Sequence, residues 1–335
     1  MSPILSIIVP CFNEAEVIRA THERLIRTLV PLGESFEILY INDGSRDVTL
    51  EILSQLASHD DRVKVINFAR NFGHQAAVSA GLEYAGGAAI VIIDADLQDP
   101  PEVIGAMVKK WREGFDVVYG QRIARAGETA FKKFTADLFY RLLNLLSDTD
   151  IPQNVGDFRL IDRRIARIIS QMPERHRFLR GMISWVGFRQ CALPYSREAR
   201  FAGKTKYPLR KMMRFASDGV ISFSTAPLKI SVWLGLFCAG LAVVLILYAA
   251  GARLFTNQWV SGWAFISIAI SFFSGVQLVA IGVIGSYIGR IFEEAKGRPL
   301  FVIEGLRGFA EQPALLPAHG HDAAARVPAP TDMPM

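Results

Sequence analysis

Two long apolar runs without a charged residue set the strongest limit on how this chain can fold. Neither Ile230–Ala252 nor Thr256–Gly289 contains Asp, Glu, Lys or Arg, and each exceeds the roughly 20 residues that a helix needs to cross a bilayer. Trp233 and Tyr287 lie near the ends of the runs, where membrane proteins concentrate aromatic side chains. The runs predict a two-helix transmembrane hairpin within residues 229–290. The alternative is a helical hairpin buried inside a soluble protein.

Basic residues flank this hairpin at its two outer ends. They precede the first run at Arg210, Lys211, Arg214 and Lys229 and follow the second at Arg290, Lys296 and Arg298. The short connection between the runs carries Arg253. By the positive-inside rule, the N-terminal region and the C-terminus are both expected in the cytoplasm.

The N-terminal region alternates strand and helix patterns. Strands are expected at 5–10, 36–41, 63–68, 88–93 and 116–119, and helices at 14–29, 49–59, 74–85 and 101–113. This alternation predicts an α/β fold with a mostly parallel sheet covered by helices on both faces. We expect an α/β domain at 1–205, an amphipathic juxtamembrane segment at 206–228, the hairpin at 229–290, a cytoplasmic segment at 291–309 and a disordered Ala- and Pro-rich tail at 310–335.

The stretch Ala88–Pro101 joins an apolar strand pattern to acidic residues. Asp94 and Asp96 directly follow the expected strand, and ligands of α/β proteins bind at the carboxyl ends of the strands. Carboxylate oxygens suit Mg²⁺ or Mn²⁺, whose coordination is commonly completed by substrate phosphates. The pattern indicates a divalent metal that holds a diphosphate, and a solvated acidic turn is the alternative.

Two earlier strands also end in polar clusters, Pro10-Cys11-Phe12-Asn13-Glu14 and Asn42-Asp43-Gly44-Ser45. An aromatic ring beside acidic groups could stack on a nucleobase while the acids bind its edge or the ribose. Asn-Asp-Gly alone is often a simple turn. The prediction of a nucleotide site therefore depends on the clusters taken together.

Cations are concentrated between the predicted α/β core and the hairpin. Residues 121–229 hold 21 Lys or Arg against 9 Asp or Glu, whereas the remainder is net acidic. A basic segment before a transmembrane helix is typical of a surface that meets anionic lipid headgroups. Without a recognition motif, this charge does not indicate nucleic-acid binding. The cysteines Cys11, Cys191 and Cys238 lack metal-site spacing and are expected to be reduced thiols.

These motifs resemble those of the inverting family 2 glycosyltransferases, whose fold is the nucleotide-sugar-binding α/β domain called GT-A. The resemblance is carried by Val9–Glu14, Ile41–Ser45, Arg70–Gly73, Asp94–Glu102, Gly156–Leu160, Gly203–Tyr207 and Ser222–Leu228, with Phe188 and Arg200. Over roughly residues 4–305, the pattern is similar to the polyprenyl-phosphate branch of the family, which includes bactoprenol glucosyltransferases and dolichyl-phosphate mannose synthases. The Gln-x-x-Arg-Trp motif of processive polysaccharide synthases is not found in the sequence.

The resemblance implies a donor site made from the strand-end clusters. Nucleotide binding is expected of Pro10, Phe12, Glu14, Asp43, Asp94 and Ala95. The metal ligands are expected to be Asp96, Gln98 and Asp94. Through the metal, Asp96 would assist departure of the nucleoside diphosphate. The alternative for Gln98 is a polar residue at the start of a helix.

The expected acceptor is a lipid phosphate, so its site should be cationic. Arginine forks bind phosphate in a bidentate manner, and the candidates are Arg122, Arg125, Arg200 and Lys204. The pair Lys132 and Lys133 is instead expected to face solvent or headgroups.

Asp157 has the position of a catalytic carboxylate, for which general base is the usual role. A phosphate monoester is already ionised near pH 7, so its oxygen needs little deprotonation before it attacks. Asp157 could instead orient the acceptor, pair with Arg159 or another cation, or hold a sugar hydroxyl.

The expected protein is a polyprenyl-phosphate glycosyltransferase of the bacterial inner membrane that transfers a hexose from a nucleotide sugar to undecaprenyl phosphate. UDP-glucose is the expected donor, with GDP-mannose or a UDP-amino sugar as alternatives. The resemblance also implies a homo-oligomer. A non-catalytic membrane scaffold is the alternative from another class.

Overall fold

The computed structural model describes residues 3–123, 155–197, 226–255 and 262–309. Its described residues form an eight-stranded sheet in the order β7-β5-β6-β4-β1-β2-β3-β8. The strands are β1 Leu5–Cys11, β2 Phe36–Asn42, β3 Val63–Phe68, β4 Ala89–Ile92, β5 Val117–Arg122, β6 Val155–Asp162, β7 Gln190–Tyr195 and β8 Ile303–Arg307. β6 and β8 run antiparallel to their neighbours and the other pairs are parallel, which confirms the mostly parallel sheet.

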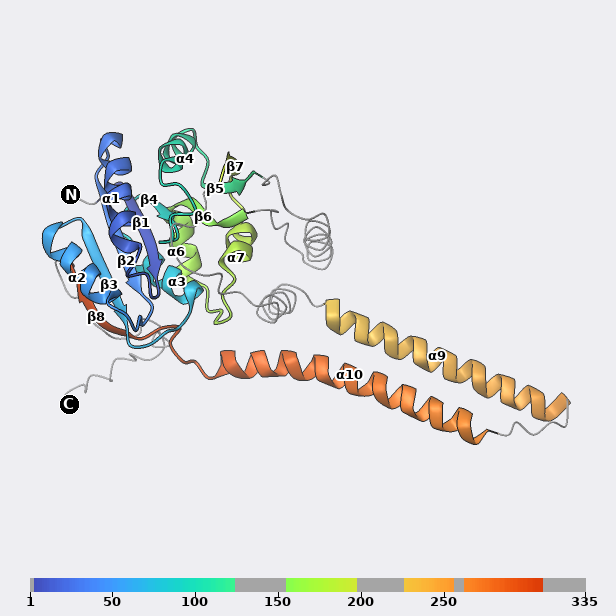
Figure 1. The fold of residues 1–335 in the computed structure, drawn as a ribbon. Helices are drawn as coiled ribbons and strands as arrows, with labels where there is room; N and C mark the ends of the chain where they lie inside the picture. The colour runs from blue at the N-terminus through green and yellow to red at the C-terminus, as the bar shows by residue number, and fades with distance from the viewer. Residues whose placement is uncertain (1–2, 124–154, 198–225, 256–261, 310–335) are drawn as a thin grey trace, which may run out of the picture.

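Helices cover both faces of the sheet (Figure 1). One face packs against α1 Ile18–Leu29, α2 Thr49–His59 and α4 Val103–Arg112. The other face packs against α3 His74–Tyr84, α6 Arg163–Gln171 and α7 Leu179–Val186. The strands β1 and β2 are buried along their whole length, as expected for parallel strands with helices on both sides.

Several helix ends differ from the expected ones for local reasons. The helix expected from Glu14 begins at Ile18, because the Glu14 carbonyl accepts hydrogen bonds from the backbone N–H groups of Val17 and Ile18 in a preceding turn. The helix expected from Pro101 begins at Val103. The short 3-10 helix Val30–Leu32 extends the end of α1. The bounds of α2 and β3 agree with the expected ones.

The antiparallel pairing of β4 with β6 brings acidic residues of two segments to the same edge of the sheet. Ile92 pairs with Arg159, and continuing the register by two residues places Asp94 opposite Asp157. β6 therefore begins at the sheet edge where the parallel strands end. The sequence patterns had not indicated β6, β7 or β8.

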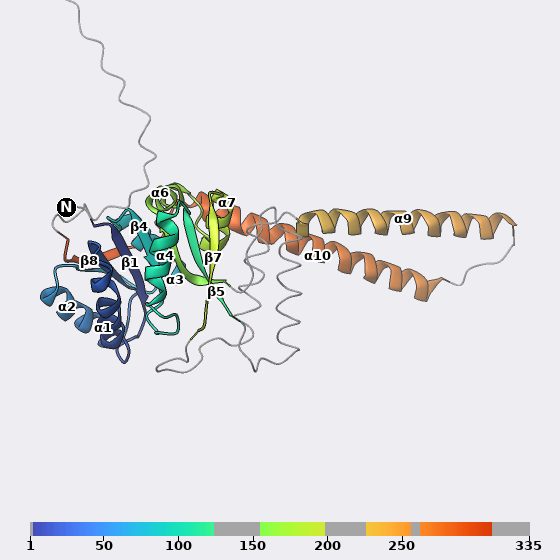
Figure 2. The ribbon, with the colours of Figure 1, turned by 90° about the horizontal axis from the view of Figure 1, so that it is seen from above.

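Beyond the sheet, α9 Ala226–Phe255 and α10 Trp263–Ala295 form an antiparallel pair that extends away from the α/β domain (Figures 1 and 2). Large apolar side chains such as Trp233 and Leu278 are 72% and 69% exposed. Within the described residues, one segment, Phe272–Ala295, is long and apolar enough to cross a membrane, and Leu228–Val244 is a shorter apolar segment. A second full span stays a prediction.

After α10 the chain returns to the sheet. Phe301 stacks on Phe68 with ring centroids 5.1 Å apart, and β8 then pairs with β3. At the end of α10, Glu294 accepts a hydrogen bond from the Arg175 backbone N–H at 2.8 Å. The expected cytoplasmic segment 291–309 thus supplies an edge strand of the α/β domain (Figure 1).

Candidate active site

The loops that follow β1 and β2 are joined by hydrogen bonds. The Asn13 N–H donates to Ser45 Oγ at 3.0 Å, and Asn13 Oδ1 accepts from the Arg46 N–H at 2.8 Å. The Glu14 N–H donates to Thr49 Oγ1 at 2.9 Å. The two polar clusters expected to meet therefore form one wall at the carboxyl edge of the sheet.

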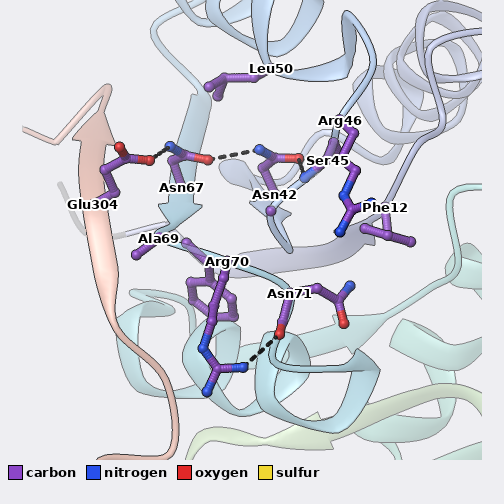
Figure 3. Close-up of a pocket in the computed structure, with 12 residues that line it drawn as sticks. Phe12, Asn42, Ser45, Arg46, Leu50, Asn67, Ala69, Arg70, Asn71 and Glu304 are labelled. Carbon is purple, nitrogen blue, oxygen red and sulfur yellow. Dashed lines mark hydrogen bonds between the residues drawn. The ribbon is translucent and has the colours of Figure 1, made fainter.

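A cavity of about 320 Å³ opens beside this wall. It is lined by Phe12, Asn42, Gly44, Ser45, Arg46, Leu50, Asn67, Phe68, Ala69, Arg70, Asn71 and Glu304 (Figure 3). Asn42 Nδ2 donates to Asn67 Oδ1 at 2.7 Å, and Asn67 Nδ2 donates to Glu304 Oε2 at 2.8 Å. An aromatic ring, amide groups and cations are a suitable lining for a planar polar ligand such as a nucleobase. Among the predicted nucleotide-binding residues, Phe12 lines this cavity.

The carboxylate of Asp43 holds a loop of the protein. It accepts hydrogen bonds from the Phe72 N–H at 2.7 Å, the Gly73 N–H at 3.0 Å and Asn71 Nδ2 at 2.8 Å. Burial raises the pKa of Asp43 despite the opposing backbone hydrogen bonds. Gly44, at φ 64°, lies so close to the Arg70 backbone that a Cβ would not fit. The Asp43 carboxylate thus orders residues 70–73 beside the cavity.

Other predicted nucleotide-binding residues lie along the same edge. Pro10 is buried within β1 and pairs with Ile41 of β2. Ala95 is buried, and its carbonyl accepts a hydrogen bond from Thr21 Oγ1 at 2.7 Å. Both side chains are therefore part of the frame around the site.

The acidic motif after β4 turns sharply at Leu97, a non-glycine residue at φ 55°. Asp94 and Asp96 are both half-buried, and Asp96 Oδ1 accepts a hydrogen bond from the Gln98 N–H at 3.2 Å. Burial raises the pKa of Asp94, and the nearby charges of Asp157, Asp99 and Asp96 raise it further against the lowering effect of His74. This concentration of negative charge fits a divalent cation.

The described residues contain no group of three or more His, Cys, Asp or Glu side chains arranged to hold a metal. A Mg²⁺ ion typically takes one or two carboxylates and completes its shell with water and substrate phosphates. The carboxylates of Asp94 and Asp96 and the side-chain amide of Gln98 offer oxygen donors of the type that such an ion takes, and their binding of a metal stays a prediction.

Asp157 lies at the centre of an ionic cluster. Arg180 Nε on α7 donates to Asp157 Oδ1 at 2.7 Å, and His74 Nε2 at the start of α3 lies 3.2 Å from Asp157 Oδ2. His74 Nε2 is also 3.8 Å from Asp94 Oδ1. The imidazole thus lies between the acidic motif that follows β4 and the Asp157 carboxylate on β6.

The contacts in this cluster shift the pKa values of Asp157 and His74 in opposite directions. Burial alone would raise the pKa of Asp157, but the hydrogen bonds and charges of His74 and Arg180 hold it well below its usual range. Burial opposes protonation of His74, yet Asp157 and Asp94 raise its pKa to about 9. An ionised Asp157 between two cations is a poor proton acceptor.

Arg122 ends β5 beside a buried carboxylate, Asp99. Its Nη2 lies 3.6 Å from Asp99 Oδ2, and its Nε donates to the Tyr195 hydroxyl at 3.3 Å. Arg125, Arg200 and Lys204, also predicted to bind the acceptor phosphate, lie outside the described residues.

The sequence motifs did not indicate His74, Arg180 or Tyr195 as residues of the site. They also did not indicate that Asp99 pairs with arginines. His74 follows the Arg70–Gly73 motif directly, which is the one signal that could have drawn attention to it. Asp99 lies in the loop after β4, within the acidic motif itself. Arg180 and Tyr195 come from α7 and β7, in a cationic stretch without clear periodicity.

Comparison with known proteins agrees with this geometry. Residues 6–169 match glycosyl transferase family 2. The chain is 48% identical over 299 residues to the glycosyltransferase YkcC of Bacillus subtilis, covering 89% of this chain and 93% of that protein. It is 41% identical over 302 residues to the SfII prophage-derived bactoprenol glucosyl transferase of Shigella flexneri, covering 90% and 97%.

Among solved structures, glucosyl-3-phosphoglycerate synthase of Mycobacterium tuberculosis, in complex with Mn²⁺, UDP-glucose and phosphoglyceric acid, aligns with a TM-score of 0.44 at 18% identity, over 65% of this chain and 78% of that one. This likeness is too low to bear on substrate or mechanism.

The fold is that of a glycosyltransferase with a GT-A α/β domain. The chain belongs to glycosyl transferase family 2.

Proposed function

We propose that this enzyme transfers a hexose from a nucleotide sugar to a polyprenyl phosphate in the membrane, with inversion at the anomeric carbon. The observation that carries the proposal is the 41% identity to a bactoprenol glucosyl transferase over 302 residues. An alignment of that length takes in the helical hairpin as well as the α/β domain. Glucose is accordingly the proposed sugar and UDP-glucose the proposed donor.

The nucleotide of the donor would occupy the cavity beside Phe12, with its diphosphate directed toward Asp94 and Asp96. The ring of Phe12 offers a stacking surface, and the Asn42–Asn67 pair offers amide groups to the base. A Mg²⁺ or Mn²⁺ held by Asp94, Asp96 and Gln98 would neutralise the charge that develops on the departing nucleoside diphosphate.

The acceptor phosphate would supply its own nucleophilic oxygen. With a second pKa of about 6, a phosphate monoester is largely dianionic at neutral pH. The lowered pKa of Asp157 is consistent with this, because a carboxylate held by His74 and Arg180 is a weak base. We therefore assign Asp157 the task of holding Arg180 and His74 in place at the reaction centre, one of the alternatives to a general base.

The hairpin would bring the acceptor to the site. With α9 and α10 spanning the bilayer and the α/β domain on the cytoplasmic side of a bacterial inner membrane, the lipid phosphate reaches the domain by lateral diffusion. Holding the phosphate at interface depth would supply the proximity that a two-substrate displacement requires. The proposal includes a homo-oligomeric enzyme and no nucleic-acid partner.

The test is sugar transfer by the purified full-length protein in detergent, with undecaprenyl phosphate, Mg²⁺ or Mn²⁺, and radiolabelled UDP-glucose, UDP-galactose, UDP-N-acetylglucosamine or GDP-mannose. Lipid-linked label from UDP-glucose is the expected result. Label from another donor would show that glucose is not the sugar transferred. Metal-dependent UDP binding without transfer would contradict the assignment of undecaprenyl phosphate as the acceptor. Loss of both activities would favour the scaffold alternative, with Asp96→Ala as the control for metal-dependent binding.

A further inference from the structure

Asp99 is a fully buried carboxylate that the donor chemistry does not use. It belongs to the same loop as Asp94 and Asp96, but it is 0% exposed and faces β5 and β7. Its Oδ1 accepts a hydrogen bond from the Tyr195 hydroxyl at 2.5 Å. Its Oδ2 has no hydrogen-bond partner among the described residues. A buried ionised oxygen is costly unless cations compensate it.

Two arginines provide that compensation. Arg197 Nε lies 3.2 Å from Asp99 Oδ1, and Arg122 Nη2 lies 3.6 Å from Asp99 Oδ2. Their side chains remain 25% and 30% exposed. Burial, followed by the hydrogen bond to Asp99, raises the pKa of Tyr195 to about 12, so its hydroxyl keeps its proton. One carboxylate therefore faces two guanidinium groups, and the cluster carries a net positive charge.

The backbone leaves room for this arrangement. A Cβ on Gly156 would overlap the Arg122 guanidinium, and a Cβ on Gly120 would lie 2.7 Å from Cε1 of Tyr195. Gly156 immediately precedes Asp157, so the Arg122 guanidinium lies beside the reaction centre. Phe158 packs edge-on against the Tyr195 ring with centroids 5.6 Å apart, which fixes the ring that holds Asp99.

We propose that Arg197 and Arg122 together bind the acceptor phosphate, and that Asp99 and Tyr195 are positioning residues that hold the two guanidinium groups for it. This inference rests on the proposed function and adds Arg197, Asp99 and Tyr195 to its acceptor site. The two guanidinium groups and the single carboxylate leave one positive charge uncompensated, which attracts a phosphate anion, and two arginine forks match its oxygens.

The experiment measures transfer kinetics of the full-length protein in detergent, with KM for undecaprenyl phosphate and for UDP-glucose determined separately and UDP affinity measured by calorimetry. Arg197→Gln is expected to raise the KM for undecaprenyl phosphate about tenfold or more, with an unchanged KM for UDP-glucose. Gly156→Ala should have the same signature, because its Cβ displaces the Arg122 guanidinium.

Tyr195→Phe tests positioning without removing a cation. It removes the hydroxyl that donates to Asp99 Oδ1 and accepts from Arg122 Nε, and it should raise the acceptor KM about threefold or more through loss of these two hydrogen bonds. Arg164→Gln is the matched control, because Arg164 on α6 is an exposed arginine that pairs with Asp116 and Asp162. The kinetics of this variant should equal those of the wild type.

A rise in the UDP-glucose KM or a loss of UDP affinity, with an unchanged acceptor KM, would assign the cluster to the donor diphosphate and overturn the proposal. Unchanged values in both Arg197→Gln and Gly156→Ala would make the cluster purely structural. Absence of transfer by the wild-type enzyme would instead contradict the proposed function, so the two failures are distinguishable.

Discussion

The Asp157 carboxylate combines two contacts that a proton acceptor would not keep, one to Arg180 Nε at 2.7 Å and one to His74 Nε2 at 3.2 Å. Both partners are cationic at neutral pH, since the pKa of His74 is raised to about 9. The ionised carboxylate therefore stabilises the arrangement of the cations that surround it. Removing one partner of a buried ionic cluster leaves the others uncompensated.

Asp157→Asn keeps the size of the side chain and removes its charge. We expect turnover to fall about 100-fold, the scale of loss that follows misplacement of groups at a reaction centre, while metal-dependent UDP affinity stays close to that of the wild type. Steady-state kinetics and UDP titration provide the two measurements. Wild-type turnover in this variant would remove Asp157 from the reaction.

Individual residues also show how far the sequence can predict a site. The strand-end residues Phe12, Asp43 and Asp94 were predictable, because parallel strands bring their carboxyl ends to one edge. The Asp43 carboxylate accepts hydrogen bonds from the backbone of residues 72–73, and nucleotide binding by Asp43 stays a prediction. His74 and Arg180 were not predictable, because their meeting depends on the antiparallel entry of β6 and on α7.

At the scale of elements, α6 illustrates how a short helix is fixed to the sheet. Asp162 ends β6 and caps α6, accepting a hydrogen bond from the Arg164 N–H at 2.9 Å. It also accepts one from Trp111 Nε1 of α4 at 3.0 Å. One carboxylate thus connects helices on opposite faces of the sheet.

Asp162→Ala should lower the free energy of unfolding by ~1–2 kcal/mol through loss of the cap and the Trp111 bond. Burial alone would raise the pKa of Asp162, but its hydrogen bonds lower it overall. Its contribution is therefore present above the unfolded pKa of ~3.9 and is lost as the pH falls through the lower folded pKa. Thermal unfolding in detergent should show a difference from the wild type at pH 7 that shrinks below about pH 4. A difference that does not vary with pH would contradict this account.

At the scale of the whole molecule, the α/β domain and the long helices differ in where their apolar side chains lie. The domain buries its apolar side chains on both faces of the sheet, whereas many described side chains of α9 and α10 are apolar and exposed. The two helices extend away from the domain (Figures 1 and 2). The uncharged runs predicted these helices, whereas the return of the chain to β3 is a long-range contact that no local pattern could indicate.

Val279→Lys places a charge on the segment that is apolar enough to span a membrane, where Val279 is 62% exposed. A central lysine costs about 2.5–3.5 kcal/mol on insertion scales, so the fraction of protein that resists alkaline extraction from membranes should fall. Val302→Lys, at a 45% exposed position outside the hairpin, should extract like the wild type. Equal extraction of both variants would argue against membrane insertion of α10.

Strand β8 also sets the order of events during biosynthesis. Ribosomes deliver the chain from its N-terminus, so β3 leaves the ribosome well before its partner Ile303–Arg307, which follows both long helices. More than 200 residues separate the two strands, which takes roughly 10–50 s at ~5–20 residues per second. During this interval the β3 edge has unpaired backbone groups that can template aggregation. If the hairpin inserts slowly into the membrane, the first observable effect should therefore be aggregation of the α/β domain.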